Sequence, residues 1–337
     1  MLCDQALAVT LNDIVKGWPT RTEAFHRWVL NTFEMIWPTL RTAQKFILED
    51  DVALTCTAIS QNRPSSVMAA MKFAVLPFKV VWIEWTGLAG YEVIANPEPD
   101  MIVVRRVGLL IEADSDLRSG IARLFWSLPP PYDIVRISPH GAQFDFTDGV
   151  FSKFGRPTPR SNTESTRKHF PHWFTNAADL AALEQMDRQV LPLSIRETIG
   201  EAGQSDFTAW DLEAAQRISR ASDISWQNKI PLLRAFLIMM NCHNGTETFD
   251  ADVARQNRAR QRSGRLPLFE HKVIRLKLRG PERHALAASK GEQTTPLRAH
   301  LVRGHFKVRK TGVFFWSPFV RGDAKAGVID HRYEVQP

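Results

Sequence analysis

The chain has 337 residues, of which 44% are hydrophobic and 23% are charged, and its formal net charge is +7. These proportions are typical of globular proteins and exclude a chain that is disordered as a whole. The three cysteines, Cys3, Cys56 and Cys242, are widely spaced and form no Cys-x-x-Cys pair, which favours a reducing cytoplasm over a disulfide framework or zinc finger. The longest apolar stretches, Met101–Ile111 and Ile230–Met240, are too short or too interrupted by charge to span a bilayer, so we expect no membrane partner.

The first predicted element is a helix over Thr20–Trp37, where Thr20 and Glu23 have the spacing of a capping box. Pro38 is expected to end or kink this helix, which then resumes over Thr39–Leu48. A second helix is predicted over Ser65–Leu76, before Pro77.

Five apolar, β-branched segments follow and predict strands. They are Phe78–Trp85, Met101–Ile111, Ile121–Trp126, Asp133–Ile137 and Ala142–Phe146. Clusters of proline and glycine separate them. We expect one mostly antiparallel sheet with the preceding helices on one face. Within the first strand, Glu84 lies between two tryptophans, and a salt-bridged or edge-facing carboxylate is its default interpretation.

The middle of the chain is predicted to be helical. Residues 156–176 are polar and form a linker or exposed loop. Helices are expected over Ala177–Gln189, Leu193–Gly200, Thr208–Ala221 and Ser225–Asn241. Residues 232–240 are apolar nearly all round, which predicts a buried helix.

The positive charge is concentrated near the C-terminus. Residues 251–310 contain 16 Lys and Arg against 4 Asp and Glu, whereas the first 250 residues contain 24 against 29. A basic segment on a mildly acidic protein is typical of binding to a polyanion, most often nucleic acid. Residues 254–265 are expected to form an extended or partly helical arm, and His271–Leu278 a strand. Further strands are predicted over His300–Arg309, Val313–Val320 and Val328–Val335.

The predicted strand His300–Arg309 has two different faces, because side chains alternate along a strand. One face carries Val302, Phe306 and Val308, and the other carries Arg303, His305, Lys307 and Arg309. Such basic groups lie about 7 Å apart and suit the phosphates of an extended nucleic-acid strand. The predicted nucleic-acid-binding residues are Arg258, Arg260, Arg262, Arg275, Lys277, Arg303, His305, Lys307 and Arg309. The alternative is a solvated face whose cations pair with carboxylates of the N-terminal part.

The same face could act as a metal-independent ribonuclease. His305 would transfer the proton, and Arg303 and Lys307 would stabilise the charged phosphate. A second acid or base is needed, and the candidates are His300, His331 and Asp323. His300 would require a bulge at Gly304 to reach the same face.

Aromatic residues and metal ligands are less specific. Phe314, Phe315, Trp316 and Phe319 could stack on bases, although at least half of them are expected in the core. The close pairs His169/His172 and Cys242/His243 lack the repeated spacing of a zinc site, so we predict no metal site. No G-x-G-x-x-G, P-loop or G-x-S-x-G pattern is present, and no cofactor is expected.

Three stretches of the chain resemble a loosely defined set of uncharacterised proteins encoded by tailed bacteriophages and bacterial prophages. They are Leu76–Trp85 with Val107–Glu112, Asn241–Leu268, and His300–Val335. The most specific part is Arg303-Gly304-His305-Phe306-Lys307. The resemblance implies a phage or bacterial origin and a cytoplasmic setting in a bacterial host, but it supplies no activity and no functional residue.

We therefore expect an α+β protein with a helix-and-sheet part (1–155), a linker or loop (156–176), a helical part (177–245) and a basic β-rich C-terminal part (246–337). The first hypothesis is a non-enzymatic nucleic-acid-binding protein. The second is the ribonuclease or toxin built on His305. The third is a virion-associated protein or one that binds a phage or host protein through its basic region.

Overall fold

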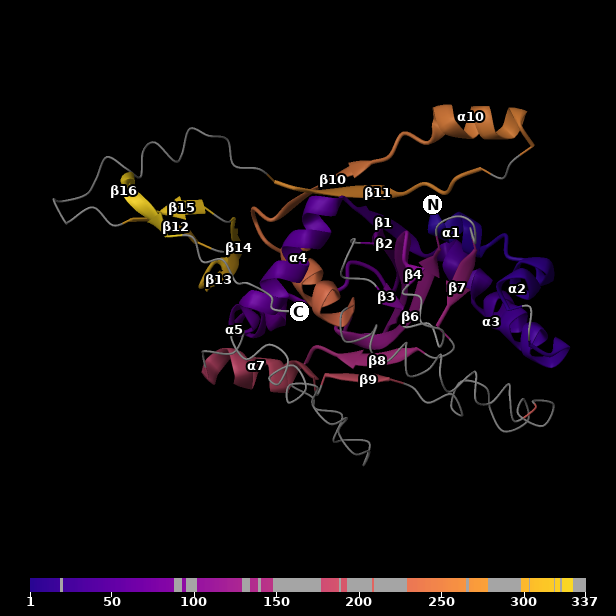
Figure 1. The fold of residues 1–337 in the computed structure, drawn as a ribbon, viewed down its shortest axis with the longest axis horizontal. Helices are drawn as coiled ribbons and strands as arrows, with labels where there is room; N and C mark the ends of the chain where they lie inside the picture. Colours follow the sequence, from indigo (N-terminus) through magenta and orange to yellow (C-terminus); the bar gives the residue numbers. More distant parts are fainter. Residues whose placement is uncertain are drawn as a thin grey trace.

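The computed structural model describes residues 1–18, 21–87, 93–94, 102–128, 134–138, 141–147, 177–187, 189–192, 208, 229–264, 267–277, 298–302, 304–317, 319–321 and 323–329. At the centre of these residues is a nine-stranded sheet (Figure 1). Its strands are β1 (Gln44–Leu48), β2 (Val80–Thr86), β5 (Arg106–Ala113), β6 (Ser119–Ser127), β7 (Val135–Ile137), β8 (Ala142–Asp145), β9 (Val190–Pro192), β10 (Thr246–Asp250) and β11 (Lys272–Leu276). Their order is β10-β11-β1-β2-β5-β6-β8-β9, and β7 also pairs with β6.

The sheet is mixed but mostly antiparallel. Strand β1 runs parallel to both of its neighbours, β2 and β11, and the other pairs are antiparallel. The chain crosses from β1 to β2 through α4 (Asp50–Asn62), α5 (Pro64–Ala69) and the 3-10 turn Met71–Phe73. A parallel pair requires a crossover of this kind. The predicted α+β class and the mostly antiparallel sheet are confirmed.

Helices cover both faces of the sheet, whereas the sequence predicted helices on one face only. Helices α1 (Leu2–Ala6), α2 (Leu11–Gly17) and α3 (Glu23–Thr42) form one core with Trp82. On the other face, α4, α5 and the helix of residues 229–240 pack against Val81, Ile83 and Trp85. The prediction was wrong because β2 is apolar at almost every position, a pattern that indicates burial on both faces.

Trp82 fits between the sheet and the N-terminal helices because Gly108 on the paired strand β5 has no side chain. A Cβ atom at Gly108 would lie 2.3 Å from the Trp82 ring. The ring then packs edge-on against Phe125 of β6, with 5.1 Å between the ring centroids. The glycine is therefore a packing requirement of the core.

Helix α3 continues through Pro38 to Thr42, so the helix does not end at the proline. Its N-cap is Thr22, whose side chain accepts a hydrogen bond from the Phe25 amide. The predicted helical continuation over residues 39–48 is also wrong beyond Thr42, because residues 44–48 form β1 between β2 and β11. Strand pairing with two neighbours has outweighed the local helical pattern.

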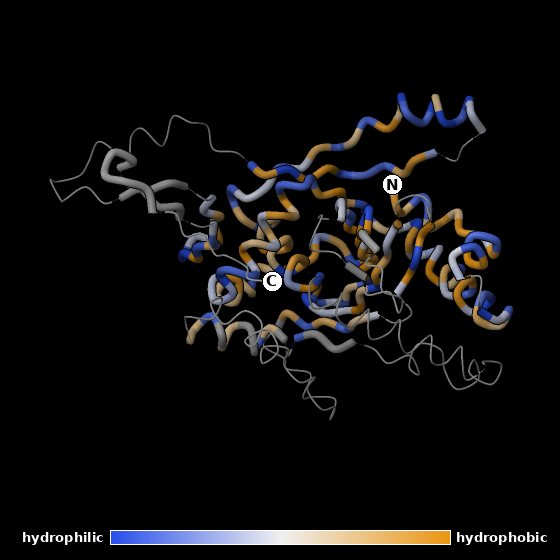
Figure 2. Tube along the Cα trace, viewed as in Figure 1, coloured by the Kyte–Doolittle hydropathy of each residue, from blue (hydrophilic) through white to orange (hydrophobic). Residues whose placement is uncertain are grey.

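The helical middle is described in two places. Helix α7 (Ala177–Asp187) matches its prediction, and residues 229–240 form the predicted buried helix, coloured orange in the core of Figure 1 and strongly hydrophobic in Figure 2. The predicted linker at 156–176 and the predicted helices over 193–200 and 208–221 lie outside the described residues, apart from Thr208. None of the helices that the structure describes combines the length and apolarity needed to cross a membrane.

The C-terminal strands form smaller units. A three-stranded sheet contains β12 (Arg298–Val302), β15 (Phe319–Arg321) and β16 (Asp323–Ile329), and a two-stranded hairpin contains β13 (His305–Arg309) and β14 (Gly312–Trp316). Two short strands, β3 (Val93–Ile94) and β4 (Ile102–Val103), pair separately. The single strand predicted over residues 300–309 is wrong, because the chain leaves one sheet after Val302 and enters the hairpin at His305. Strand β16 begins five residues before the predicted 328–335, whose residues beyond 329 lie outside the described part.

The carboxylate of Glu84 is fully buried beneath the N-terminal helix and collects four donors. It accepts hydrogen bonds from the amides of Leu2 (3.0 Å) and Cys3 (3.4 Å) and from the Trp82 indole N–H (3.0 Å). Arg106 completes the set with an ion pair, its Nε 2.5 Å from Oε1. This matches the salt-bridged interpretation made from the sequence, and it joins β2, β5 and α1 through one charged group.

Replacing Glu84 with leucine should lower the free energy of unfolding by about 3–5 kcal/mol, because the change leaves the Arg106 guanidinium and three N–H donors without their partner. Urea denaturation measures the loss. The matched control is Glu112→Leu, since Glu112 is 43% exposed and lies 3.8 Å from Arg123. That variant should lose less than about 1 kcal/mol. Equal losses in the two variants would contradict the assigned role of Glu84.

Candidate nucleic-acid interface

The β13–β14 hairpin has one buried face and one cationic face. Its buried side chains are Phe306, Val313 and Phe315, which join the core beside α5. The opposite side chains are His305, Lys307, Arg309, Phe314 and Trp316. The predicted alternation is confirmed for residues 305–309. We call these five outward side chains the hairpin face.

Two cations on the hairpin face lie over aromatic rings of the partner strand. Lys307 Nζ is 4.5 Å from the centroid of the Trp316 ring, and the Arg309 guanidinium is 5.7 Å from that of Phe314. The His305 ring lies 5.7 Å from Trp316. Contacts of this kind at exposed sites contribute about 0.5–1 kcal/mol each. The rings therefore hold the cations in place only weakly, and both cations remain exposed.

Two polar side chains fix the hairpin to the body of the protein. Ser66 of α5 accepts a hydrogen bond from the Phe306 amide (2.8 Å) and donates one to the Phe306 carbonyl (3.1 Å). Asn244 does the same for Phe315, donating to its carbonyl at 2.8 Å and accepting from its amide at 3.0 Å. Each side chain thus satisfies a backbone N–H and C=O pair of a strand, as a neighbouring strand would.

His243 closes the turn end of the hairpin. Its Nε2 lies 3.1 Å from the Thr311 carbonyl, and its ring is 5.1 Å from that of Phe314. This position is possible only above a glycine, because a Cβ atom at Gly312 would lie 2.6 Å from Nε2. Gly312 also has φ +134°, a conformation that favours glycine.

A second cationic group lies on helix α10 (Ala254–Arg262), in the segment 251–271 that we call the arm. Helix α10 has no buried residue and is among the most hydrophilic segments in Figure 2. Arg255, Arg258 and Arg262 are exposed and share one side of the helix, because they are three and four residues apart. Asn257 and Arg260 are half-buried on the other side. The predicted partly helical arm is therefore a helix that presents three arginines to solvent.

Contacts with the N-terminal part hold the arm in place. The Asn257 side chain donates to the Leu268 carbonyl (3.0 Å) and accepts from the Leu268 amide (2.6 Å). The next amide, of Phe269, donates to Asp4 at 3.2 Å. The ammonium group of buried Lys45 lies 4.5 Å from the centre of the Phe269 ring. These contacts give a helix without a hydrophobic face a defined position.

The remaining predicted residues divide into neutralised and exposed groups. Arg275 forms a 2.6 Å ion pair with Glu49 and lies 5.1 Å above the Phe249 ring, while its neighbour Lys272 pairs with Asp250 at 2.6 Å. Lys277 is exposed at the end of β11. Arg303 lies outside the described residues. The alternative interpretation of the sequence, in which the cations pair with carboxylates, therefore holds for Lys272 and Arg275 of β11. It does not hold for the hairpin, because Lys307 and Arg309 have no ion pair among the described residues.

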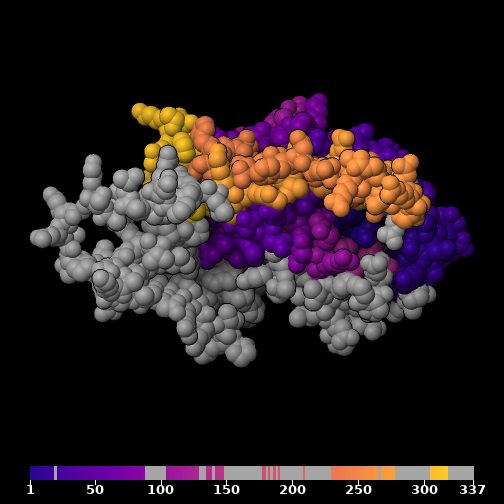
Figure 3. Space-filling model, turned by 90° about the horizontal axis from the view of Figure 1, so that it is seen from above, coloured from indigo at the N-terminus to yellow at the C-terminus, as the bar shows by residue number. Residues whose placement is uncertain are grey.

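The arm helix and the hairpin lie at opposite ends of the molecule. Figure 1 places α10 beyond one end of β10 and β11, and β13–β14 near the other end. The view from above agrees, with the orange segment of residues 246–277 extending over the N-terminal part and the yellow hairpin at its far end (Figure 3). Among the described residues, the exposed cations of α10 and those of the hairpin therefore lie apart.

The positions of His243 and His305 bear on the ribonuclease hypothesis, which requires a second acid or base close to His305. His243 brings a second imidazole to the hairpin, but it lies over Gly312, whereas His305 lies against Trp316. Four residues of β14 separate these positions, about 13 Å along a strand. Proton donor and acceptor must both lie within about 3 Å of the reacting atoms, so His243 cannot be the partner of His305. Of the predicted partners, the side chains of His300 and Asp323 and all of His331 lie outside the described residues, and the hypothesis stays a prediction.

Thiols and metal ligands offer no second site in the described part. Its His, Cys, Asp and Glu side chains form no group of three that could hold a metal ion. Cys242 packs in the core just after the buried helix, and Cys3 and Cys56 are fully buried. Burial raises the pKa of Cys3 and of Cys242 to about 12, and it raises the pKa of Cys56 as well.

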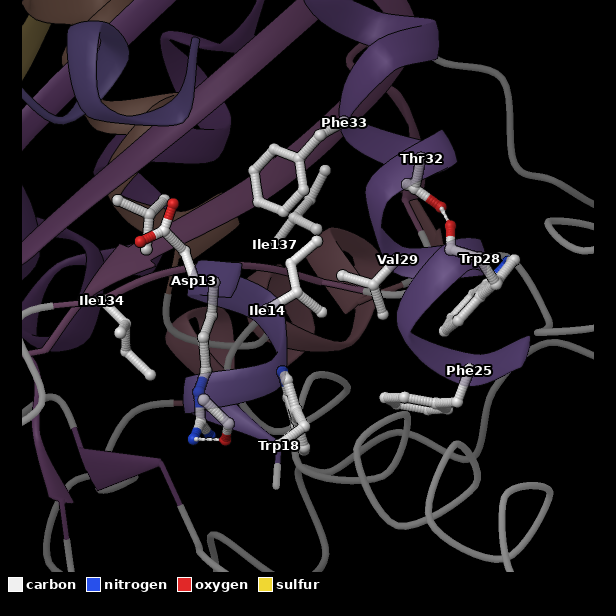
Figure 4. A pocket seen from close by; sticks show the side chains of 13 residues that line it. Asp13, Ile14, Trp18, Phe25, Trp28, Val29, Thr32, Phe33, Ile134 and Ile137 are labelled. Carbon is white, nitrogen blue, oxygen red and sulfur yellow. Dashed lines mark hydrogen bonds between the residues drawn. The ribbon is translucent and has the colours of Figure 1, made fainter. Parts of the chain in front are cut away.

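An aromatic pocket lies between α2, α3 and β7, and encloses about 480 Å³, including space open to solvent (Figure 4). Trp18, Phe25 and Trp28 line one side, with 5.6 Å between successive ring centroids. Its polar groups bond within the pocket walls. Asp13 caps α2 with Thr10, and Arg136 lies 4.3 Å above the Trp18 ring and donates to the Gly17 carbonyl at 3.4 Å. These contacts between the residues of the pocket walls hold α2 and α3 against the sheet.

Replacing Gly312 with alanine should loosen the hairpin, because the new Cβ would collide with His243 and the backbone conformation would be strained. Hydrogen exchange of the amides of residues 305–316 measures the effect, and we expect protection to fall by at least about tenfold. Gly264→Ala is the control, since Gly264 also has a positive φ (+66°) but a Cβ there would meet nothing within 4 Å. Unchanged protection in Gly312→Ala would show that His243 does not fix the turn.

The three thiols should react slowly with Ellman's reagent in the folded protein at about pH 8, because burial disfavours the thiolate. All three should react at once in urea. Stability should also fall as the pH rises from 9 towards 12, since thiols of the unfolded chain ionise above 9 while Cys3 and Cys242 stay protonated until about 12. A thiol that reacts rapidly without denaturant would contradict this burial.

Three features of the site were missed in the sequence: the hairpin anchors Ser66 and Asn244, and His243 above the turn. No local pattern connects Asn244 with Phe315, 71 residues away. Compared with protein-family models, with curated proteins and with solved structures, the chain gives no significant match. The functional interpretation therefore depends on the geometry described above, and the resemblance to phage and prophage proteins stays a prediction.

Proposed function

We propose that this protein binds nucleic acid through two cationic surfaces, the hairpin face and the arginine side of α10. The observation that carries the proposal is the exposure of their cations. Lys307 and Arg309 on the hairpin and Arg255, Arg258 and Arg262 on α10 are all exposed, without an ion pair among the described residues. Exposed cations of this kind displace condensed counterions from a phosphate backbone, which drives binding.

The distribution of charge over the chain supports the same proposal. Residues 1–250 have five more carboxylates than Lys and Arg, so repulsion would keep a polyanion away from much of this part. The cationic excess lies in residues 251–310, and within its described part Lys272 and Arg275 of β11 are neutralised by Asp250 and Glu49. A polyanion is therefore attracted to the arm and the hairpin.

Binding to a fluorescein-labelled strand of about 20 nucleotides, long enough for one site, should weaken steeply between about 50 and 200 mM salt. The slope of log K against log salt should fall by up to about 1.4 in Lys307→Gln/Arg309→Gln on a single strand. It should fall by up to about 2.7 in Arg255→Gln/Arg258→Gln/Arg262→Gln on a duplex, if every removed cation contacts one phosphate. Fluorescence anisotropy measures both slopes.

The control removes the same number of charges as the hairpin variant from another surface, in Lys16→Gln/Arg27→Gln. Lys16 is exposed on α2, and the Arg27 side chain is 56% exposed on α3. Equal effects of the control and the hairpin variant would indicate attraction by net charge alone and would refute an assigned surface. Binding that does not change with salt, or no binding at low salt, would refute the proposal as a whole. In that case co-purification at fixed stoichiometry with one phage or host protein would favour the protein-binding hypothesis.

A further inference from the structure

We infer that the hairpin face binds unpaired nucleotides, with bases stacked on Trp316 and Phe314 and phosphates on Lys307 and Arg309. The inference deepens the proposed function and rests on it. It concerns the hairpin and not the arm. Helix α10 presents cations on its exposed side but no aromatic ring on which a base could stack. The argument depends on the spacing, accessibility and rigidity of the two rings.

The two rings have a spacing that an unstacked strand can follow. Phe314 and Trp316 are two residues apart on one face of β14, which separates them by about 7 Å. Bases in a duplex are stacked on each other and offer only their edges, so an aromatic side chain cannot reach their faces. An unpaired strand exposes the faces of its bases and can place successive bases on successive rings.

The groups that cover the rings are able to move aside. Lys307 and Arg309 lie over Trp316 and Phe314 through long, exposed side chains. Exposed contacts between a cation and a ring are weaker than the stacking of a base on a ring. A base can therefore replace each cation over its ring, and the cation then lies beside the phosphate of the same nucleotide. Lys310, exposed at the turn, adds a third cation at this end.

The platform beneath the rings is rigid. Val313 and Phe315 alternate with the two rings and are 1% and 4% exposed. Asn244 holds the backbone of Phe315 from the side, and the His243 ring packs against Phe314. A rigid platform reduces the entropy lost on binding, so the two rings can contribute affinity without ordering a loop.

The test compares a mixed-sequence single strand and the corresponding duplex in binding to the full-length protein, by fluorescence anisotropy. In Phe314→Leu/Trp316→Leu we expect single-strand affinity to fall by about 5- to 150-fold for each ring removed, with duplex affinity unchanged. The salt slope should also stay unchanged, because no phosphate contact is removed. In Lys307→Gln/Arg309→Gln, by contrast, the slope itself should fall.

Two further variants guard against a trivial loss of structure. Trp316→Phe keeps a ring at the same position and should retain most of the single-strand affinity. Phe249→Leu removes a ring that is 41% exposed on β10 and lies under Arg275, outside the hairpin, and should leave single-strand binding unchanged. Hydrogen exchange of residues 305–316 in the double-leucine variant confirms that the hairpin is still formed.

The outcomes separate this inference from the proposed function. If the wild-type protein binds neither probe, both fail together. If it binds both probes with a strong dependence on salt, but the double-leucine variant affects neither or weakens both equally, the single-strand inference is overturned and polyanion binding stands. A loss confined to the single strand, with Phe249→Leu unchanged, supports base stacking at the hairpin.

Discussion

The burial of β2 and β5 on both faces is the constraint on which the rest of the structure depends. Val81, Ile83 and Trp85 point to one side of β2 and Trp82 to the other, and all four are excluded from water. Two layers of helix are needed to cover such strands. One layer comes from the first 42 residues, and the other combines α4 and α5 with the helix of residues 229–240, which begins 160 residues after the end of α5. Distant segments therefore fold into one body around the sheet.

This central packing also determines where the cations lie. Strand β11 pairs with β1, which brings a basic strand beside the acidic residues that follow β1 and neutralises Arg275 with Glu49. Strands β10 and β11 complete one edge of the sheet, and the chain between them extends along the surface. Helix α10 in this segment has no residue in the core. Arg255, Arg258 and Arg262 of α10 have no ion pair among the described residues, whereas Lys272 and Arg275 of β11 pair with Asp250 and Glu49. The difference comes from position in the fold and not from residue type.

The hairpin shows how the same fold can present a rigid cationic face. It has a small buried face and would be marginal by itself, because an isolated two-stranded hairpin is barely stable in water. Two side chains from elsewhere satisfy its outer backbone groups: Ser66 fixes it against α5, and Asn244 fixes it against the turn that follows the helix of residues 229–240. The consequence is that its outward side chains do not depend on a flexible loop for their arrangement. Their alternation follows directly from the strand geometry.

The sequence by itself determined the α+β class, the five central strands, the buried helix at 229–240, the cationic arm and the two-faced character of residues 305–309. These follow from local periodicity and composition, which act over a few residues. Only the tertiary structure decided that residues 44–48 form a strand, because β1 is stabilised by two partners, one of them more than 220 residues away. It also decided that the described cations of α10 and of the hairpin lie apart, and that Asn244 and His243 contact the hairpin. Pairing, neutralisation and anchoring are contacts between distant residues, and local pattern carries no information about which distant residues meet.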